Sequence, residues 1–374
     1  MKNYFNYLLI GVFSFLLFSC GGESAQEKNK KALDSVSGPV SDRVNDPVTY
    51  HSVPDSLLGG NPIKYDTRKV IDKVYITNRP GAKGREQASH DGREIAEYGY
   101  GGLVEVIEIS GDWYGISDRI TRDFNRDGQK IEVTRWEKVY ILKSETGEAD
   151  SVALNWIELN SCYVTELNGE RIMPPYESES PELFHLELVS EAEYNYQKSV
   201  SVKKLVQDSS GVIQKNRDVT LKLKEGTKVY RRIDKGDEVE EYTFKGVIPS
   251  LDAYLLRGDY YENHGFILVD KNTGKELVKM GDFPAISSTN KYIASIQANP
   301  YNGSGDLELY IIQSKNIKHV ISVSFDKWMP VIDDENIFWG NDKTLYIKLN
   351  HVGVFWVESG SQNENGQYAK LILK

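Results

Sequence analysis

Residues 103–116, LVEVIEISGDWYGI, decide the fold class of this chain. Residues 103–109 are rich in valine and isoleucine, residues 110–112 are the turn formers Ser-Gly-Asp, and residues 113–116 begin a second run with Trp and Tyr. β-Branched and aromatic runs on both sides of a turn are typical of paired antiparallel strands. The stretch therefore predicts a β-hairpin, and similar patterns along the chain predict an all-β fold.

The residues around this stretch extend the pattern. Short strand patterns occur at residues 74–76 and 95–98, with Asn, Pro and Gly between them, and another occurs at residues 136–141. Residues 74–117 resemble the bacterial SH3-like domain in their opening strand, in the glycine-containing loop before a valine-rich strand, and in the Gly-x-Trp-Tyr strand. The resemblance implies an SH3-like barrel over residues 70–160.

An insertion precedes the last strand of this SH3-like pattern. It contains residues 123–130, DFNRDGQK, in which Asp123, Asn125 and Asp127 occupy the first three ligand positions of a helix-loop-helix calcium loop. Such a loop needs Glu at its twelfth position, where this chain has Thr134. Asp-Gly between two β-rich runs is instead a hairpin signal. We expect an extended hairpin inserted into the barrel, with calcium binding as the alternative.

The region from residue 180 to 374 alternates strand patterns with turns and shows no convincing amphipathic helix. A faint repeat begins at residues 248–251 (IPSL), 283–286 (FPAI) and 329–332 (MPVI), with starts 35 and 46 residues apart. These spacings fit one four-stranded propeller blade. The region resembles the blades of WD40-like and TolB-like propellers, which implies a small or incomplete β-propeller-like domain. An irregular β-sandwich is the alternative.

The first 20 residues have the features of an export signal. Lys2 gives a positive start, and residues 7–18 form an apolar run shorter than the roughly 20 residues that span a bilayer. Residues 17–20, LFSC, resemble the lipobox of bacterial lipoproteins of the Bacteroidetes type. The resemblance implies cleavage before Cys20 and lipid attachment to it. An ordinary signal peptide cut near Ser19 or Gly21 and an uncleaved anchor are the alternatives.

Residues 21–69 are predicted to be a flexible tether between the lipid and the folded part of the chain. They lack periodicity and are rich in Gly, Ser, Asp, Lys and Pro, so they cannot bury enough apolar surface to offset the entropy of ordering. Gly21 after the cysteine favours the outer membrane over the inner one, with the periplasmic and surface faces both open. Three Asp-Ser-hydrophobic tripeptides resemble O-glycosylation sites of Bacteroidetes secreted proteins: Ser35, Ser56 and Ser151.

Composition and motifs argue against several function classes. The net charge of -10 argues against nucleic acid as a partner and against an anionic membrane surface, because both select basic patches. The six histidines are scattered without zinc spacing, and no nucleophile elbow, Walker loop or dinucleotide fingerprint occurs. We therefore expect a non-enzymatic protein with no catalytic residue, cofactor or metal.

Two reactive-looking groups have structural interpretations. Cys162 is the only cysteine after Cys20, so it cannot form an intramolecular disulfide in the mature chain, and its strand-like surroundings predict a buried thiol. The acidic residues Asp333, Asp334 and Glu335 lie between two strand patterns and are predicted to form a solvated turn.

Aromatic residues of the SH3-like region are the candidate ligand-binding site. They are Tyr98, Tyr100, Trp113 and Tyr114, because SH3-like barrels line a peptide groove with exposed aromatics. Purely structural roles are the alternative, above all for Trp113. The expected function is that of a cell-envelope lipoprotein that binds peptide, peptidoglycan or an envelope protein. An envelope enzyme or accessory with a loop-assembled site, and a periplasmic inhibitor or immunity-type protein, are the alternatives.

Overall fold

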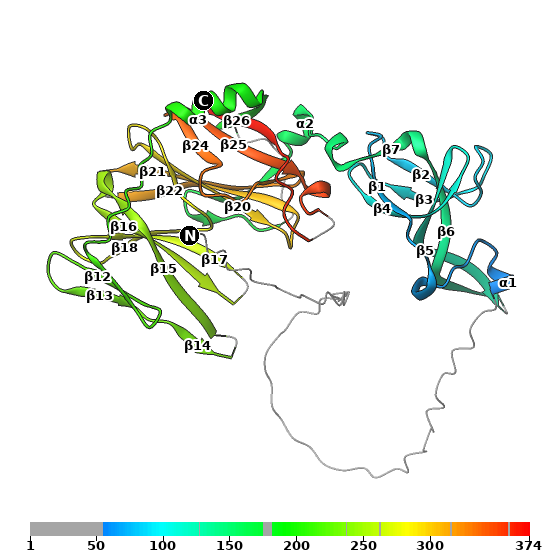
Figure 1. Ribbon diagram of the computed structural model, residues 1–374, viewed down its shortest axis with the longest axis horizontal. Helices are drawn as coiled ribbons and strands as arrows, with labels where there is room; N and C mark the ends of the chain where they lie inside the picture. The colour runs from blue at the N-terminus through cyan, green and yellow to red at the C-terminus, as the bar shows by residue number, and fades with distance from the viewer. Residues whose placement is uncertain are drawn as a thin grey trace, which may run out of the picture. The chain divides into compact units, whose positions relative to one another are not determined.

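Antiparallel sheets dominate the computed structural model, which describes residues 55–126, 128–174, 182–236, 238–261, 263–314, 316–357 and 360–374. The strands of these residues form five sheets, numbered I to V here, and none of them closes into a barrel (Figure 1). The predicted all-β class is confirmed.

Sheet I contains the stretch on which the fold prediction rests, and its strand order is β3–β2–β6–β5–β4–β1–β7. The bounds are β1 Asp72–Ile76, β2 Ala82–Arg85, β3 Glu94–Tyr98, β4 Leu103–Ser110, β5 Trp113–Arg126, β6 Gln129–Leu142 and β7 Thr146–Gly147. The sheet is open, with β3 and β7 at its edges, so the barrel expected over residues 70–160 is not closed. The physical reason is that β7 has two residues and pairs with β1 alone.

Two hairpins in sheet I follow the sequence prediction. Ser110 pairs with Trp113 across a turn in which Gly111 has a φ of +57°, a conformation that glycine adopts without steric cost. The strands β5 and β6 pair over their whole length of 14 residues each. The extended hairpin expected around residues 123–130 is therefore present, and Asp127 lies outside the described residues.

A buried ion-pair cluster ties residues 59–61 to this long hairpin. The fully buried Glu137 carboxylate accepts hydrogen bonds from Arg122 Nε and Nη2, at 3.0 and 2.6 Å, and from Arg135 Nε at 3.0 Å. It also accepts the backbone N–H of Asn61 at 3.1 Å. Burial raises the pKa of Glu137, but the hydrogen bonds from the two arginines outweigh burial and hold this pKa below its ordinary value. Residues 59–61, which the sequence places in the flexible tether, thus have fixed partners in sheet I.

Four further sheets form the C-terminal region. Sheet II has the order β11–β12–β13, with bounds Val212–Lys215, Asp218–Lys222 and Thr227–Tyr230. Sheet III contains β14 Ile233–Lys235, β15 Glu238–Ile248, β16 Ala253–Tyr260, β17 His264–Asp270 and β18 Glu276–Met280, in that order. Sheet IV has the order β19–β20–β21–β22–β8–β9, with bounds Ala285–Ile286, Tyr292–Asn299, Ser304–Gln313, Asn316–Phe325, Cys162–Leu167 and Glu170–Arg171. Sheet V has the order β10–β26–β25–β23, with β24 beside β25, and bounds β10 Phe184–Val189, β23 Trp328–Pro330, β24 Ile337–Asn341, β25 Thr344–His351 and β26 Gln367–Leu373.

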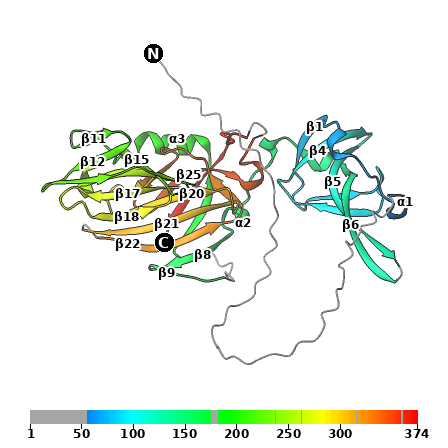
Figure 2. The same cartoon turned by 90° about the horizontal axis from the view of Figure 1, so that it is seen from below.

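Sheets II, III, IV and V pack face to face in that order (Figures 1 and 2). Sheet III packs against sheet II through Leu256 and against sheet IV through Leu255. In sheet IV, Ile293 faces sheet III whereas Ala294 faces sheet V, because successive residues of a strand point to opposite faces. Both faces of these two sheets are buried, which explains why their strands are apolar without strict alternation.

The three copies of the faint sequence repeat fall in three successive sheets. Residues 248–251 lead into β16 of sheet III, residues 283–286 contain β19 of sheet IV, and residues 329–332 overlap β23 of sheet V. The repeat does not account for β8 and β10, which come from earlier in the chain and pair with β22 and β26.

One helix covers a face of sheet V, contrary to the expectation from the sequence (Figure 1). The helix α3 (Glu191–Val200) begins after Ser190, whose hydroxyl accepts the backbone N–H of Glu193 at 3.1 Å. Its one buried residue, Tyr194, packs against Tyr368 and Phe338 with ring centroids 4.6 and 5.1 Å apart. Because a single position in ten is buried, the sequence carries little helical periodicity.

The other α-helices are single turns, α1 (Asp55–Leu58) and α2 (Trp156–Leu159). A capping box stabilises α2, since the Asn155 side chain accepts the N–H of Glu158 and the Glu158 carboxylate accepts the N–H of Asn155, both at 2.9 Å. None of the helices in the described part of the chain is both long and apolar enough to cross a bilayer.

Candidate functional site

Two of the predicted aromatic residues support sheet I. Trp113 is 6% exposed, and its ring contacts His90 edge to face with centroids 5.2 Å apart. Tyr114 is half-buried against the core of the sheet, and the Lys143 ammonium lies 5.3 Å from its ring centroid. Both side chains therefore have structural partners.

The other two predicted residues are anchored through their hydroxyls. Tyr98 O–H donates to Asp118 Oδ2 at 2.7 Å. Burial raises the pKa of Tyr98, and the Asp118 carboxylate raises this pKa further. The hydroxyl of Tyr100 accepts the N–H of Ala153 at 2.7 Å and donates to the carbonyl of Ala153 at 2.9 Å. Such bonds fix both rings and leave little freedom for adapting to a ligand.

Tyr100 also contacts a buried histidine, the last residue of β25 in sheet V. Its ring meets the ring of His351 edge to face, with centroids 5.4 Å apart. His351 Nδ1 accepts the N–H of Gly353 at 3.0 Å. A Cβ at Gly101, whose φ is +78°, would lie 2.6 Å from the His351 ring, so only glycine fits there. Burial lowers the pKa of His351, and Glu158 opposes this effect while Arg79 and Lys327 add to it.

The buried histidine predicts a loss of stability in mild acid. Because the folded-state pKa of His351 lies below its ordinary 6.5, the unfolded chain binds more protons, and the free energy of unfolding decreases as pH falls below about 6.5. His319, whose pKa is also lowered by burial, adds to the decrease. We expect His351→Gln to weaken the pH dependence of urea unfolding between about pH 7 and 5. The control, His185→Gln, changes a histidine at a more exposed site. An unchanged pH slope in His351→Gln would contradict the assignment.

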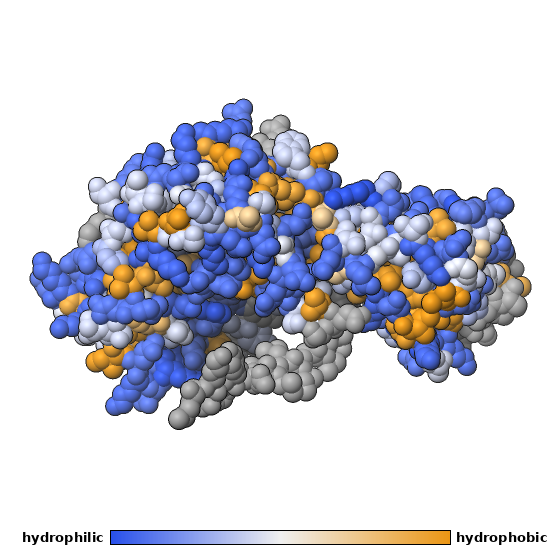
Figure 3. Space-filling model, turned by 45° about the horizontal axis from the view of Figure 1, so that its top comes forward, coloured by the Kyte–Doolittle hydropathy of each residue, from blue (hydrophilic) through white to orange (hydrophobic). Residues whose placement is uncertain are grey.

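Apolar side chains on the surface do not identify a site by themselves. On the face shown in Figure 3, they form several separate patches on a largely hydrophilic background rather than one continuous area. Scattered exposed apolar residues are normal for folded proteins.

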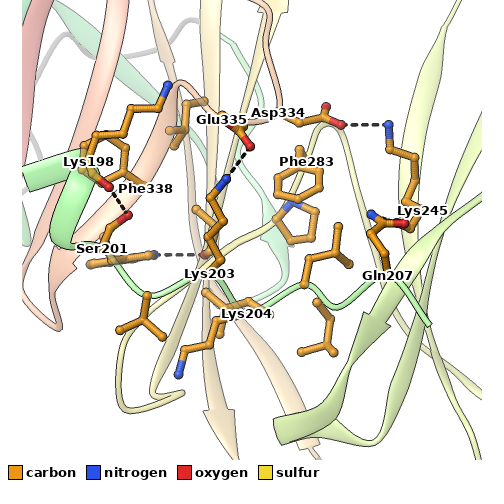
Figure 4. Close-up of a pocket in the computed structure, with 18 residues that line it drawn as sticks. Lys198, Ser201, Lys203, Lys204, Gln207, Lys245, Phe283, Asp334, Glu335 and Phe338 are labelled. Carbon is orange, nitrogen blue, oxygen red and sulfur yellow. Dashed lines mark hydrogen bonds and ion pairs between the residues drawn. The ribbon is translucent and has the colours of Figure 1, made fainter. Parts of the chain in front are cut away.

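A cavity of about 460 Å³ provides a more specific site (Figure 4). Its lining comes from four separate segments. These are residues 198–207, which include the end of α3 and the chain after it, residues 245–248 of β15, residues 283–286 around β19, and residues 334–339, which lead into β24. Its volume falls within the range of small-ligand sites, roughly 300 to 1,000 Å³.

The cavity wall is apolar and held by well-packed aromatic rings. Phe283, Phe338 and Trp339 line it together with aliphatic residues. Trp339 Nε1–H donates to the carbonyl of Ala285 at 3.0 Å, and its ring stacks on Tyr292 with centroids 5.9 Å apart. These contacts fix the Trp339 ring, so the wall is pre-formed.

Charged groups surround the cavity. Lys203 pairs with Glu335 at 2.6 Å, and Lys245 pairs with Asp334 at 2.8 Å. The hydrogen bond from Lys203 lowers the pKa of Glu335. Figure 4 shows both carboxylates pointing at their lysine partners. The predicted acidic turn is present, since the Asp333 side chain accepts the N–H of Glu335 at 2.8 Å, but the sequence did not indicate that it borders a cavity.

Two half-buried lysines at the cavity contact neutral oxygens. Lys198 Nζ lies 3.4 Å from Asn336 Oδ1, and Lys204 Nζ donates to the carbonyl of Ser288 at 2.6 Å. Neither lysine forms an ion pair with a described residue. Sequence reasoning missed this site because its parts lie far apart along the chain. The available signal was the KSVSVKK segment, residues 198–204, in which alternating serine and valine residues stand between lysines.

The remaining predicted groups lie elsewhere. Cys162 is buried at the start of β8, and Ser151 is exposed. Asp123 pairs with Lys130 at 3.2 Å, and the Asn125 side chain accepts the N–H of Gly128 at 3.1 Å. No three His, Cys, Asp or Glu side chains come together as a metal site among the residues described. Cys20 and Ser35 lie outside these residues, as does the side chain of Ser56.

Comparisons with known proteins do not supply a function for this chain. No family model, no curated protein and no solved structure matches this chain.

Proposed function

We propose that this chain is a lipid-anchored, non-enzymatic protein of a bacterial cell envelope that binds a peptide, peptidoglycan or protein partner. The observation that carries the proposal is the apolar cavity bordered by lysines in the C-terminal region. A concave, mostly apolar site with a few polar groups is the usual form of a binding site. The lipobox-like residues 17–20 support the envelope, with the outer membrane favoured.

The groups around the cavity favour binding over catalysis. The one hydroxyl side chain in its lining, that of Ser201, donates to the carbonyl of Lys198 at 2.8 Å rather than to a basic side chain. A serine nucleophile requires an adjacent general base. The two lining carboxylates are each paired with a lysine, whereas a general acid needs a raised pKa.

The resemblance of residues 74–117 to SH3-like domains supports a second binding module in sheet I. The anchored aromatic residues leave the edges of this open sheet as its free hydrogen-bonding surface, and β3 is an edge strand of five residues. An extended peptide can add to such an edge through main-chain hydrogen bonds.

The test uses the full mature chain with insoluble peptidoglycan, peptidoglycan-derived peptides and chemically cross-linked envelope preparations. We expect binding in a sedimentation or calorimetric assay, with the masses of the peptides unchanged after incubation. Cleavage of a peptide or glycan would refute the non-enzymatic assignment. Binding to none of the three would refute the binding function.

Lipid attachment gives a separate prediction. Changing Cys20 to Ser is expected to remove the mass of the lipid and to move the protein from the detergent phase to the aqueous phase, because the cysteine sulfur is the attachment atom in a lipobox. Intact-mass spectrometry of protein from a bacterial envelope measures the result. Cys162→Ser is the matched control and should keep the lipid, since this thiol is buried. A lipid mass that persists in Cys20→Ser would show that Cys20 is not the attachment residue.

A further inference from the structure

We propose that the cavity between sheets III, IV and V takes a ligand with an apolar body and a carboxylate group, an inference that rests on the proposed binding function. All five residues named here line the cavity: the apolar body would lie against Phe283, Phe338 and Trp339, and the carboxylate would contact Lys198 or Lys204. A peptide with an apolar residue at its C-terminus and a free acyl carboxylate share this chemistry.

The charges at the cavity differ in sign from those of the whole chain. Four lysines and two carboxylates line it, which leaves two positive charges in excess, although the chain as a whole carries -10. Lys203 and Lys245 are already neutralised by the two carboxylates. The excess therefore belongs to Lys198 and Lys204.

These two lysines have hydrogen-bonding capacity left for a ligand. An ammonium group carries three donors, and each of the two makes one hydrogen bond to a described residue, with a neutral oxygen as acceptor. Both side chains are half-buried, where a charge is less screened by water than on the open surface. A ligand carboxylate would gain a charge-assisted hydrogen bond from either of them.

The lining favours a carboxylate over a phosphate. The cavity has no arginine among its lining residues, and arginine clusters are the usual bidentate receptors for phosphate. The apolar wall also favours a ligand that carries an apolar group, because burial of such a group against the wall contributes about 25 cal/mol per Å². A small hydrophilic anion would gain nothing from this wall.

Calorimetry with defined probes tests the inference on the full mature chain. The probes are N-acetyl-phenylalanyl-leucine, as a peptide carboxylate, and octanoate, as an acyl carboxylate, each compared with its methyl ester. We expect at least one acid to bind about ten-fold more tightly than its ester, which corresponds to about one charge-assisted contact. The acid that binds identifies the source of the carboxylate.

Two variants locate the binding. The double variant Lys198→Glu, Lys204→Glu is expected to weaken binding of the acid by about ten-fold or more. Its matched control is Lys215→Glu, which reverses an exposed lysine of sheet II outside the cavity lining. Val202→Trp is expected to block binding while leaving the fold intact, because Val202 lines the cavity and is 58% exposed.

The result that overturns the inference is equal binding of acid and ester, binding of neither acid, or binding unaffected by the lysine and tryptophan variants. Any of these would leave the proposed function standing if the same protein still sediments with peptidoglycan or cross-links to a partner. Failure of the proposed function is recognised separately, by the loss of all three forms of binding in the preceding test.

Discussion

Glu137→Leu is expected to lower the free energy of unfolding by about 3 to 5 kcal/mol, the usual cost of removing one partner of a buried ion pair. Glu137 is fully buried, and Arg122 is 6% exposed. Without the carboxylate, the Arg122 and Arg135 guanidinium groups would each lose hydrogen bonds of 2.6 to 3.0 Å in a place that water barely reaches. The backbone N–H of Asn61 would also lose its acceptor.

Urea unfolding measures this effect, with the exposed residue Glu132 of the same strand as the matched control. Glu132→Leu should change stability by less than about 0.5 kcal/mol, because its carboxylate is exposed and pairs with an exposed lysine. A second readout is limited proteolysis, in which the variant should be cut near residues 59–61 at lower protease concentrations than the wild type. Equal stability of Glu137→Leu and Glu132→Leu would show that the cluster does not anchor this segment.

Trp328→Ala is expected to lower the free energy of unfolding by about 3 to 5 kcal/mol. Trp328 has no exposed surface and stacks on Phe325 with centroids 4.4 Å apart. Its Nε1–H donates to the carbonyl of Leu159 at 3.0 Å, so the ring connects β23 of sheet V to the end of α2. A Cβ at Gly305 would lie 2.9 Å from the ring, so β21 also packs closely against it. Alanine would leave a cavity bounded by all of these elements.

Two further tryptophan variants separate packing from hydrogen bonding. Trp328→Phe keeps most of the ring but leaves the Leu159 carbonyl without its donor, and we expect a loss of about 1 to 3 kcal/mol. Trp356→Ala is the control, since that side chain is 44% exposed, and its effect should be well below that of Trp328→Ala. Similar losses in Trp328→Ala and Trp356→Ala would mean that Trp328 does not connect the sheets.

Local patterns predicted the strands of this protein better than its larger organisation. Residues 103–116 were sufficient to identify the β4–β5 hairpin, because turn chemistry and β-propensity act over a few residues. The open form of sheet I was not predictable in this way, since it depends on where β3 and β7 find partners. The anchoring of residues 59–61 depends on Glu137, which is 76 residues from Asn61 in the sequence.

The candidate site was harder to predict than the fold. Tyr98, Tyr100, Trp113 and Tyr114 were chosen by residue type, and the structure gives each of them an intramolecular partner. The cavity gathers residues from four segments of the C-terminal region, and no single segment carries a motif. Only the packing of three sheets brings them together, so the lysine-containing segment 198–204 was the one local sign of it.

The pairing of β10 with β26 sets the order in which this protein can fold. Phe184 lies opposite Leu373, so sheet V joins residues 189 positions apart in the sequence. During synthesis or export from the N-terminus, β10 emerges long before its partner. Sheet V therefore completes only after β26 has been released, and such long-range pairing is slow to form. Until then, the apolar strand β10 lacks its partner and is open to aggregation, so the pairing of β26 is the step that completes sheet V.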